Sequence, residues 1–457
     1  MHTVLHRMIV EHVETAREPH SSLVYLLIPK VAARLVICTT AAFLVLVSLA
    51  PQQPTWAQVD MLPPAFVVLG PDHTATARAI TIEPRCPAIE LDGLPPLPMA
   101  VRAPPAEPDF PVLVCETPIP PGTARAVVAG QALALPLTDA QRILVLGDTG
   151  CRLKAGDPIQ ACDSPRAWPF AAVSTGAALS RPDLVIHVGD YLYREMPCPA
   201  ENAGCAGSPF GDNWAAWEAD FFGPAAPLLR AAPWVMTRGD HELCARAGSG
   251  FFRFLDPRPL TEPCRDMTEP YAVQAGELRL VVMDVSDAAD ADPTPDSVAA
   301  YAAQFATVRT LASRRSWLVM HKPLWALRPA APGPADGQEL TSLNPTLQAA
   351  SNNTLPPEIE LVLSGHIHLF EALDFADERP PQLVLGTGGT LLDPEIIVSL
   401  EGTALAGTTV ANGLSVAHFG FTTLEWRTGI LHATLHNRRG AARVVCSIIS
   451  AGIHCRR

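Results

Sequence analysis

The sequence predicts an α/β fold for most of the chain, and two observations support this prediction. From Arg142 onward, apolar runs of strand length alternate with segments of helical periodicity, which is the pattern of an α/β domain. The runs are ILVLG (143–147), DLVIHVG (183–189), PWVMT (233–237), LRLVVMD (278–284), SWLVMH (316–321), ELVLSG (360–365) and QLVLG (382–386). The clearest helix candidates between them are 213–231 and 297–314. The second observation is that polar residues of metal-ligating type follow several of these runs.

The composition fits a folded, acidic protein. The chain has 457 residues, of which 48% are hydrophobic and 17% charged, so apolar material for a core is ample and a mostly disordered scaffold is excluded. The formal net charge is −13, which argues against a protein held on nucleic acid by phosphate neutralisation. A small anion can still bind at a local positive site such as a metal.

The N-terminal residues have the features of an export signal. Residues 35–50 are apolar and uncharged, Lys30 and Arg34 precede them, and Thr55 and Ala57 suit a small-residue cleavage site. We therefore interpret 1–57 as a signal peptide with an overextended start, and expect a secreted or periplasmic protein without stable membrane insertion after cleavage. A single membrane anchor is the alternative, although about 16 apolar residues fall just short of a span.

The cysteines independently favour export. Removing Cys38 with the signal leaves ten of the eleven cysteines, an even number that suits pairing in an oxidising compartment. We predict pairs between close sequence neighbours, although the sequence does not determine connectivity. These pairs are Cys86 with Cys115, Cys151 with Cys162, Cys198 with Cys205, Cys244 with Cys264, and Cys446 with Cys455. A zinc-binding set is the weaker alternative because the chain has no CxxC motif.

Changes in composition and hydrophobic pattern divide the chain into segments. Residues 58–140 are proline-rich and contain short β-prone pieces separated by turns, which predicts a small N-terminal β-rich domain. The α/β domain follows over 141–440, and 441–457 are expected to form a disulfide-clipped C-terminal tail. The sequence does not indicate an oligomeric state.

Candidate ligands lie at the ends of successive apolar runs. The blocks are GDTG (147–150), GDYLY (189–193), GDHE (239–242), MHKP (320–323) and GHIH (365–368). Ligands of open α/β sheets bind beyond the carboxyl ends of the strands, so these side chains are expected to converge although they span over 200 positions. The candidates are Asp148, Asp190, Tyr193, Asp240, His321, His366 and His368. One catalytic metal takes about three protein ligands, so this set predicts two metals that share a carboxylate.

The five ordered blocks resemble those of the calcineurin-like metallophosphoesterases. Most members of that superfamily have a histidine two residues after the first aspartate, where this chain has Gly150, and this chain also has Tyr193 three residues after Asp190. These two features go together in the purple acid phosphatase branch. The resemblance implies a four-layered αββα sandwich, with a small N-terminal β-sandwich-like domain similar to that of plant-type members.

The resemblance also implies a ligand assignment. Asp148, Tyr193 and His368 would hold the first metal, Asp240, His321 and His366 the second, and Asp190 would bridge them. A phenolate ligand suits a hard trivalent ion, so the implied metals are Fe(III) in the first site and Zn(II), Mn(II) or Fe(II) in the second. The implied function is a phosphoric ester hydrolase acting on small phosphate monoesters through a metal-activated hydroxide. His241, next to a ligand, is the candidate outer-sphere catalytic residue.

The sequence departs from the family pattern at Asp240, where the family usually has asparagine. The extra negative charge is expected to tighten divalent binding while making the ion a weaker Lewis acid and the site less favourable for phosphate. Two alternatives therefore stay open. The same dimetal core supports a phosphodiesterase or nucleotide pyrophosphatase, and a disabled core would leave a non-catalytic cell-surface binding protein.

Overall fold

The structure is a computed structural model that describes residues 63–260, 262–330, 338–449 and 452–457. The predicted signal peptide and the alternative membrane anchor lie outside the described residues. Within the described residues, no helix is both long and apolar enough to cross a membrane.

The larger sheet is built from both ends of the described chain. Its strands are β1 (Phe66–Leu69), β2 (Ala75–Thr81), β5 (Ala100–Ala103), β6 (Leu113–Ile119), β9 (Arg142–Leu146), β10 (Leu184–His187), β11 (Trp234–Met236), β22 (Gly420–Arg427), β23 (Ile430–Asn437), β24 (Ala442–Ile449) and β25 (Gly452–Arg456). Among the described residues they run in the order β25-β24-β23-β22-β9-β10-β11-β1-β2-β6-β5. Strands β9, β10, β11 and β1 are parallel neighbours, and the outer strands pair antiparallel. The N-terminal strands and the C-terminal hairpin thus extend one sheet, while the divisions at 140 and 440 stay predictions.

The second sheet faces the first. Its strands are β12 (Tyr271–Ala275), β13 (Leu278–Val282), β14 (Ser316–Val319), β17 (Ile359–Ser364), β18 (Phe370–Phe375), β19 (Gln382–Leu385), β20 (Ala404–Leu405) and β21 (Thr408–Val416). Their order in the described chain is β12-β13-β14-β17-β19-β18-β21-β20, with β13, β14, β17 and β19 parallel. Two small sheets complete the β structure that the described residues show. They comprise β3 (Ala88–Leu91), β4 (Leu97–Pro98), β7 (Ala126–Val128) and β8 (Gln131–Ala132), and the hairpin β15 (Leu327–Pro329) with β16 (Leu340–Ser342).

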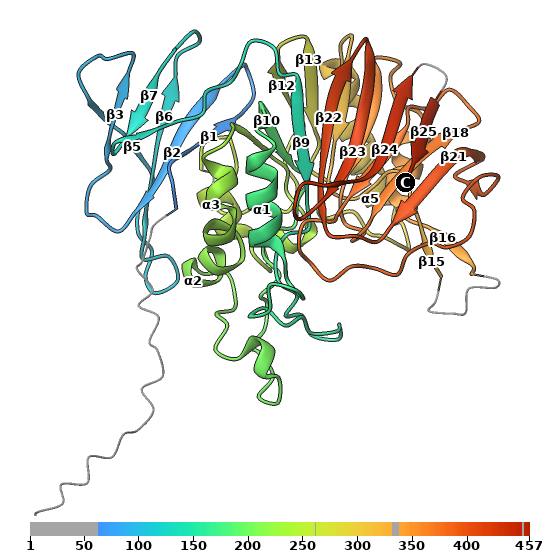
Figure 1. Ribbon diagram of the computed structural model, residues 1–457, viewed down its shortest axis with the longest axis horizontal. Coiled ribbons are helices and arrows are strands. Elements are labelled where there is room, and N and C mark those ends of the chain that lie inside the picture. The colour runs from blue at the N-terminus through green and yellow to red at the C-terminus, as the bar shows by residue number, and fades with distance from the viewer. Residues whose placement is uncertain (1–62, 261, 331–337, 450–451) are drawn as a thin grey trace, which may run out of the picture. The chain divides into compact units, whose positions relative to one another are not determined.

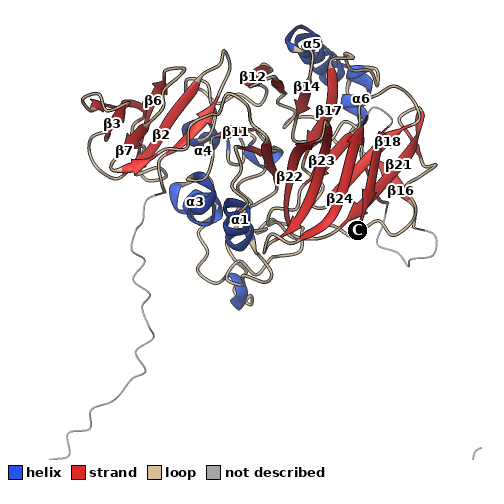
Figure 2. Cartoon of the chain, turned by 45° about the horizontal axis from the view of Figure 1, so that its top comes forward, coloured by secondary structure: helices blue, strands red, loops and turns tan. Residues whose placement is uncertain are grey.

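Helices cover the outer faces of the two sheets. Figure 1 shows α1 and α3 side by side, and Figure 2 shows α5 and α6 as a separate group. The helices are α1 (Phe170–Leu179), α2 (Trp214–Trp217), α3 (Gly223–Leu229), α4 (Gly248–Phe254), α5 (Pro295–Leu311) and α6 (Pro345–Ser351). The expected helices at 213–231 and 297–314 are thus present, the first in successive pieces. The mixed α/β sandwich implied by the sequence is confirmed.

The alternation of side chains along each strand builds three apolar layers. In β9, Ile143 and Val145 join the core between the two sheets, whereas Leu144 and Leu146 join the core beneath α1 and α3. Strand β13 divides its residues in the same way between the inter-sheet core and the core beneath α5. Because both faces of these strands are buried, the sequence reads as continuous apolar runs rather than as alternating ones.

Disulfides form between all of the predicted close sequence neighbours. The described cysteines pair as Cys86–Cys115, Cys151–Cys162, Cys198–Cys205, Cys244–Cys264 and Cys446–Cys455. The pairing predicted from the sequence is therefore confirmed. Cross-links of this kind persist in oxidising compartments, so they are consistent with an extracellular protein.

Buried arginines attach the N-terminal strands to the segment after α4. Arg78 and Arg102 both bond Glu116 Oε2 at 2.9 Å. The same guanidinium groups donate to backbone carbonyls of the 252–258 segment, including that of Phe254. Burial and the neighbouring Arg102 lower the pKa of Arg78 to about 9, although Glu116 opposes this effect. Glu116 is therefore the counter-charge that makes two buried cations tolerable.

We expect the substitution Glu116→Gln to lower the free energy of unfolding by about 2 to 3 kcal/mol, because it leaves two buried guanidinium groups without an anion. Urea unfolding measures this change. The control is Glu83→Gln, at an exposed position just after β2, which should change stability by less than about 0.5 kcal/mol. Equal stability of the two variants would contradict the proposed role of Glu116.

Candidate metal centre

The candidate ligands lie where the parallel strands of both sheets end. Asp148 follows β9, Asp190 follows β10 and Asp240 follows β11. Three of the candidates also have left-handed backbone conformations, with φ of 56° at Asp148, 62° at Asp190 and 72° at His366. Non-glycine residues rarely adopt this conformation, and where they do the strain often marks a functional site.

Asp190 and three other candidates form a compact group. Each of Asp190, Asp240, His321 and His366 offers one ligand atom, and these atoms all lie within 4.8 Å of one another. His321 Nε2 is 3.1 Å from Asp190 Oδ2 and 3.2 Å from Asp240 Oδ1. His366 Nδ1 is 3.0 Å from the same Asp240 oxygen. Two imidazole nitrogens and two carboxylates at such separations suit a divalent transition metal.

The other candidates gather around Tyr193, which contacts the same Asp190 oxygen as His321. The phenolic oxygen of Tyr193 is 2.6 Å from Asp190 Oδ2 and 2.8 Å from His368 Nε2. It is also 3.3 Å from Asp148 Oδ1. The structure thus brings all seven candidate ligands into two adjoining groups that share Asp190. This arrangement is a dimetal-like site.

The histidines are held in the orientation that metal binding requires. His321 Nδ1 lies 2.7 Å from the carbonyl oxygen of Val188, and His368 Nδ1 lies 2.9 Å from that of Leu391. Each contact fixes the ring and leaves Nε2 facing the carboxylates, as in many metal sites whose ligands are oriented by a backbone carbonyl.

Glycines make this close approach possible. A Cβ atom at Gly239 would stand 2.1 Å from Asp190 Oδ1, and one at Gly189 would stand 2.5 Å from His321 Nδ1. Any larger residue at either position would therefore displace a candidate ligand. The glycine that precedes each aspartate in the sequence blocks has a steric cause.

The buried carboxylates give the site an excess of negative charge. Burial, with Asp190 and Asp148 nearby, raises the pKa of Tyr193 well above its ordinary value. Burial lowers the pKa of His366, but Asp240 and Asp290 outweigh it and raise the value to about 9. The buried carboxylates therefore favour the protonated forms of Tyr193 and His366. Cations bound among them would offset the same negative charge and would favour the phenolate of Tyr193, so the donor set fits the predicted metals.

Glu242 organises the backbone beneath the site. Its carboxylate accepts N–H bonds from Asp190 at 3.0 Å, Tyr191 at 2.8 Å, Leu192 at 3.2 Å and Gly239 at 3.0 Å. Burial and the charge of Asp190 raise the pKa of Glu242 to about 8. This role was not predicted from the sequence, although the place of Glu242 in the GDHE block could have indicated one.

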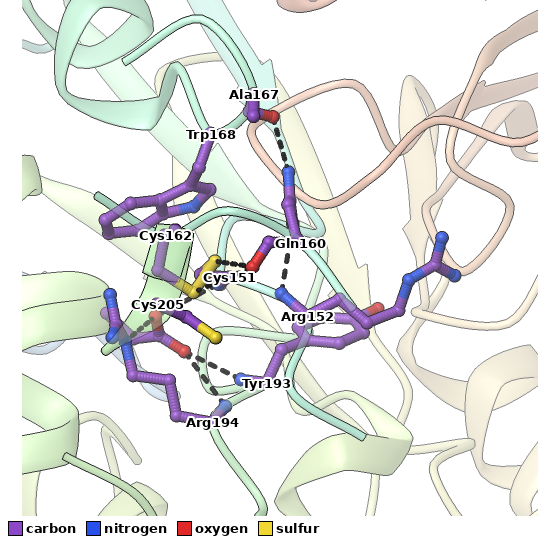
Figure 3. The surroundings of a disulfide bond; sticks show 12 residues. Cys151, Arg152, Gln160, Cys162, Ala167, Trp168, Tyr193, Arg194 and Cys205 are labelled. Atoms are coloured by element: carbon purple, nitrogen blue, oxygen red, sulfur yellow. Dashed lines mark hydrogen bonds and ion pairs between the residues drawn. A yellow bond between two sulfur atoms is a disulfide. The ribbon is translucent and has the colours of Figure 1, made fainter. Parts of the chain in front are cut away.

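A disulfide and a buried carboxylate support the loop that carries Tyr193, as Figure 3 shows. Asp220 Oδ2 accepts the backbone N–H of Tyr193 at 2.8 Å, and Asp220 Oδ1 accepts that of Cys151 at 3.0 Å. Arg194 Nε donates to Asp220 Oδ1 at 2.6 Å. The Cys151–Cys162 disulfide closes a loop within the segment after β9. Asp220 joins that segment to the one after β10, because it accepts N–H groups from both.

His241, the predicted outer-sphere residue, lies against the candidate ligands. Its ring centroid is 3.5 Å from that of Tyr193, and its Nδ1 is 2.7 Å from Glu195 Oε1. Its Nε2 is 4.0 Å from Asp190 Oδ2, on the side of the candidate ligands. Glu195, which orients the ring, comes from a segment in which the sequence showed no motif.

Asp240 has a cationic partner that the sequence did not reveal. Arg246 donates from NH1 to Asp240 Oδ2 at 2.7 Å, so this oxygen points away from His321 and His366. The same guanidinium also bonds Glu195, with Arg246 Nε at 2.8 Å from Glu195 Oε1. The ion pair is six residues apart and depends on the tight turn through η3 (Asp240–Glu242).

Asp290 and two basic residues complete the surroundings. Asp290 Oδ2 lies 2.9 Å from His366 Nε2, and Lys322 Nζ lies 3.1 Å from Asp290 Oδ1. Lys322 and Arg238, two basic residues next to the sequence blocks, are both buried. Arg238 bonds the carbonyl oxygen of Glu242 at 2.8 Å and Asp284 Oδ2 at 3.3 Å. Both cations are thus committed to structural contacts.

Comparisons with known proteins agree with this geometry. The family model described as calcineurin-like phosphoesterase matches residues 141–370. Among solved structures, the chain resembles the purple acid phosphatase PPD1 from yellow lupin (Lupinus luteus) seeds, with a TM-score of 0.54 and 13% identity over 86% of this chain and 74% of that one. It also resembles PhoD, with a TM-score of 0.50 and 10% identity over 86% of this chain and 91% of that one.

No curated protein sequence matches the chain. At these identities the solved structures bear on the fold alone. The matched residues amount to half of the chain and include all seven candidate ligands. The chain therefore belongs to the calcineurin-like phosphoesterase family.

Proposed function

We propose that this protein is an exported, dinuclear-metal phosphoesterase that hydrolyses small phosphate monoesters. The observation that carries the proposal is the placement of two adjoining donor groups that both contact Asp190. Asp148, Tyr193 and His368 form the first group, and Asp240, His321 and His366 form the second. Fe(III) suits the group with the tyrosine, and Zn(II), Mn(II) or Fe(II) suits the other.

Two metal ions in this site would activate a water for attack on phosphorus and offset the charge of the phosphate oxygens. The residues of the chain supply position and proton transfer. Glu242 and Asp220 hold the segments that carry the ligands, so little reorganisation is needed on substrate binding. His241, oriented by Glu195 through Nδ1, presents Nε2 toward the ligands and can donate a proton to the leaving oxygen.

The pairing of Asp240 with Arg246 supports a catalytic site rather than a non-catalytic one. An aspartate in the place of the family's asparagine adds a negative charge, which would repel phosphate. Arg246 lies on the oxygen of Asp240 that faces away from the histidines, so it can offset that charge without competing for the metal-facing oxygen. The side chain of Arg246 is 20% exposed, so solvent screens this pair only partly. A phosphodiesterase or nucleotide pyrophosphatase stays the alternative on the same site, and a panel of diester substrates distinguishes it.

Metal content and colour give the first test. We expect the mature protein from residue 58 to bind about two metal ions per chain, including iron, and to show a visible tyrosinate-to-iron band. Tyr193→Phe should remove the band, and Asp190→Ala should lose both ions because its carboxylate is shared. Elemental analysis and absorption spectra of the same samples measure both effects.

The control for the spectrum is Tyr191→Phe, which removes a phenol two residues away whose oxygen bonds the carbonyl of Thr237 at 3.1 Å. It should keep the band. Two metals without a band would discard the ferric assignment, and full metal retention in Asp190→Ala would refute the bridging role. A protein that binds no metal after reconstitution would favour the binding-protein alternative.

The contact between Asp290 and His366 leads to a prediction about the second metal. Asp290→Asn replaces the carboxylate that orients His366 and should weaken binding of one metal about 10- to 100-fold, as expected for an outer-sphere ligand partner. Competition with a chelator measures this affinity. Asp287→Asn, an exposed neighbour in the same loop, should leave both affinities unchanged. Equal affinities in the two variants would show that Asp290 does not act through His366.

The role of Arg246 is tested by a double-mutant cycle with Asp240. Arg246→Ala should weaken the binding of inorganic phosphate to the metal-loaded protein about tenfold, because the charge of Asp240 is then uncompensated. In the Asp240→Asn background the same change should matter less than about twofold. Calorimetric titration with phosphate gives the four dissociation constants. An equal loss in both backgrounds would mean that Arg246 acts independently of Asp240.

A further inference from the structure

We propose that a basic cavity beside the metal centre binds a second phosphate group of the substrate, so that the preferred substrates carry two or more phosphates on a small scaffold. The inference rests on the proposed function and specifies its substrate class. The cavity has a volume of about 550 Å³ and is lined by Arg166, Leu392, Ala417, His418, Phe419, Asn437, Arg438 and Arg439.

The lining has a charge opposite to that of the protein as a whole. It contains three arginines and a histidine but no acidic residue, although the chain has a net charge of −13. Within the described residues, none of Arg166, Arg438 and Arg439 has a carboxylate within ion-pair distance. Arg194 and Arg246, which each follow a candidate ligand in the chain, do have such partners. The cavity therefore holds three guanidinium groups whose charge is not offset internally.

Local hydrogen bonds fix the segments that carry these cations. Arg438 NH1 donates to the carbonyl oxygen of Pro165 at 3.1 Å, which joins the β23–β24 turn to the segment of Arg166. Asn437 Oδ1 accepts the backbone N–H of Arg439 at 2.9 Å and that of Ala441 at 3.1 Å. A turn shaped in this way presents its guanidinium groups with less loss of freedom on binding an anion.

The cavity begins one residue away from the loop that closes the metal centre. Within that loop, Gly389 and Thr390 donate to the carbonyl oxygen of Asp148 at 3.0 and 2.9 Å. The carbonyl oxygen of Leu391 then contacts His368 Nδ1 at 2.9 Å, and the next residue, Leu392, lines the cavity. From these contacts, the cavity edge lies within roughly 10 Å of the His368 ring.

This arrangement selects for a particular chemistry. A guanidinium group binds phosphate through paired, charge-assisted N–H donors, and several of them around a cavity favour a dianion. A phosphate ester held at the metal centre would place a second phosphate in the cavity if a scaffold of sugar size separated the two. A phosphate ester whose leaving group is uncharged would make no charge-assisted contact with these arginines. The cavity therefore discriminates in favour of the bisphosphate.

Glucose 1-phosphate and glucose 1,6-bisphosphate form a matched pair of probes for this inference. For the double variant Arg438→Ala, Arg439→Ala, we expect the ratio of kcat/KM for the bisphosphate to that for the monophosphate to fall about tenfold or more. Adding Arg166→Ala should lower the ratio further, and raising the salt concentration should reduce it in the unmodified protein. Initial rates of phosphate release from the metal-loaded protein measure these ratios.

Two further variants control for charge and folding. Arg314→Ala removes an exposed arginine before β14, at the opposite ends of the strands from the metal centre, and should leave the ratio unchanged. Arg439→Glu, also at an exposed position, reverses one charge without altering packing and should lower the ratio at least as much as Arg439→Ala. An unchanged ratio in Arg439→Glu and in the double variant would overturn the proposal.

Calorimetric titration separates failure of the cavity from failure of the proposed function. If the protein hydrolyses neither probe yet the double variant binds the bisphosphate about tenfold more weakly than the unmodified protein, the hydrolase proposal fails and the cavity assignment holds. Suppose that both probes are hydrolysed, and that neither the ratio of their kcat/KM values nor the ratio of their dissociation constants differs between the variants. The cavity assignment then fails while the hydrolase proposal holds. Equal weakening for mono- and bisphosphate would also overturn it, because the arginines would then act on the metal-bound phosphate.

Discussion

The buried carboxylate of Asp190 is the constraint on which the rest of the centre depends. Its oxygens contact the phenol of Tyr193, the imidazole of His321 and the backbone N–H of His241, while Gly239 packs directly against it. A buried carboxylate is stable only when its charge is met by donors or cations. The segments after β9, β10, β11 and β14 are therefore held together by the same few atoms that a pair of metals would share.

The surrounding structure stabilises this otherwise unfavourable arrangement. Left-handed backbone at Asp148, Asp190 and His366 is unfavourable in isolation, and buried carboxylates repel one another. Glu242 compensates by accepting several backbone N–H groups at the turns, and Asp220 does the same beneath Tyr193. These second carboxylates make the site rigid before any ligand arrives, which is a property expected of electrostatic catalysis.

Charge is balanced locally rather than over the whole protein. Arg246 faces both Asp240 and Glu195, Lys322 faces Asp290, and Arg194 faces Asp220, so each of these carboxylates has a cationic partner. The basic cavity at Arg166, Arg438 and Arg439 is an exception to this pattern in the described structure. An acidic protein that keeps three guanidinium groups around one cavity without internal anions has a place where a phosphate adds favourable rather than repulsive charge.

The sequence by itself determined the α/β class and the identity of the candidate ligands, and it led to a nearest-neighbour prediction of the disulfides, because each depends on local pattern. Apolar runs define buried strands, ligands follow them at strand ends, and neighbouring cysteines close short loops. Only the tertiary structure decided which side chains support those ligands. Arg246, Glu195 and Asp290 belong to no motif. Glu242 belongs to the GDHE block, but the block does not show that its carboxylate holds the backbone beneath the site. Their roles depend on how separate turns meet across the two sheets, which local pattern does not specify.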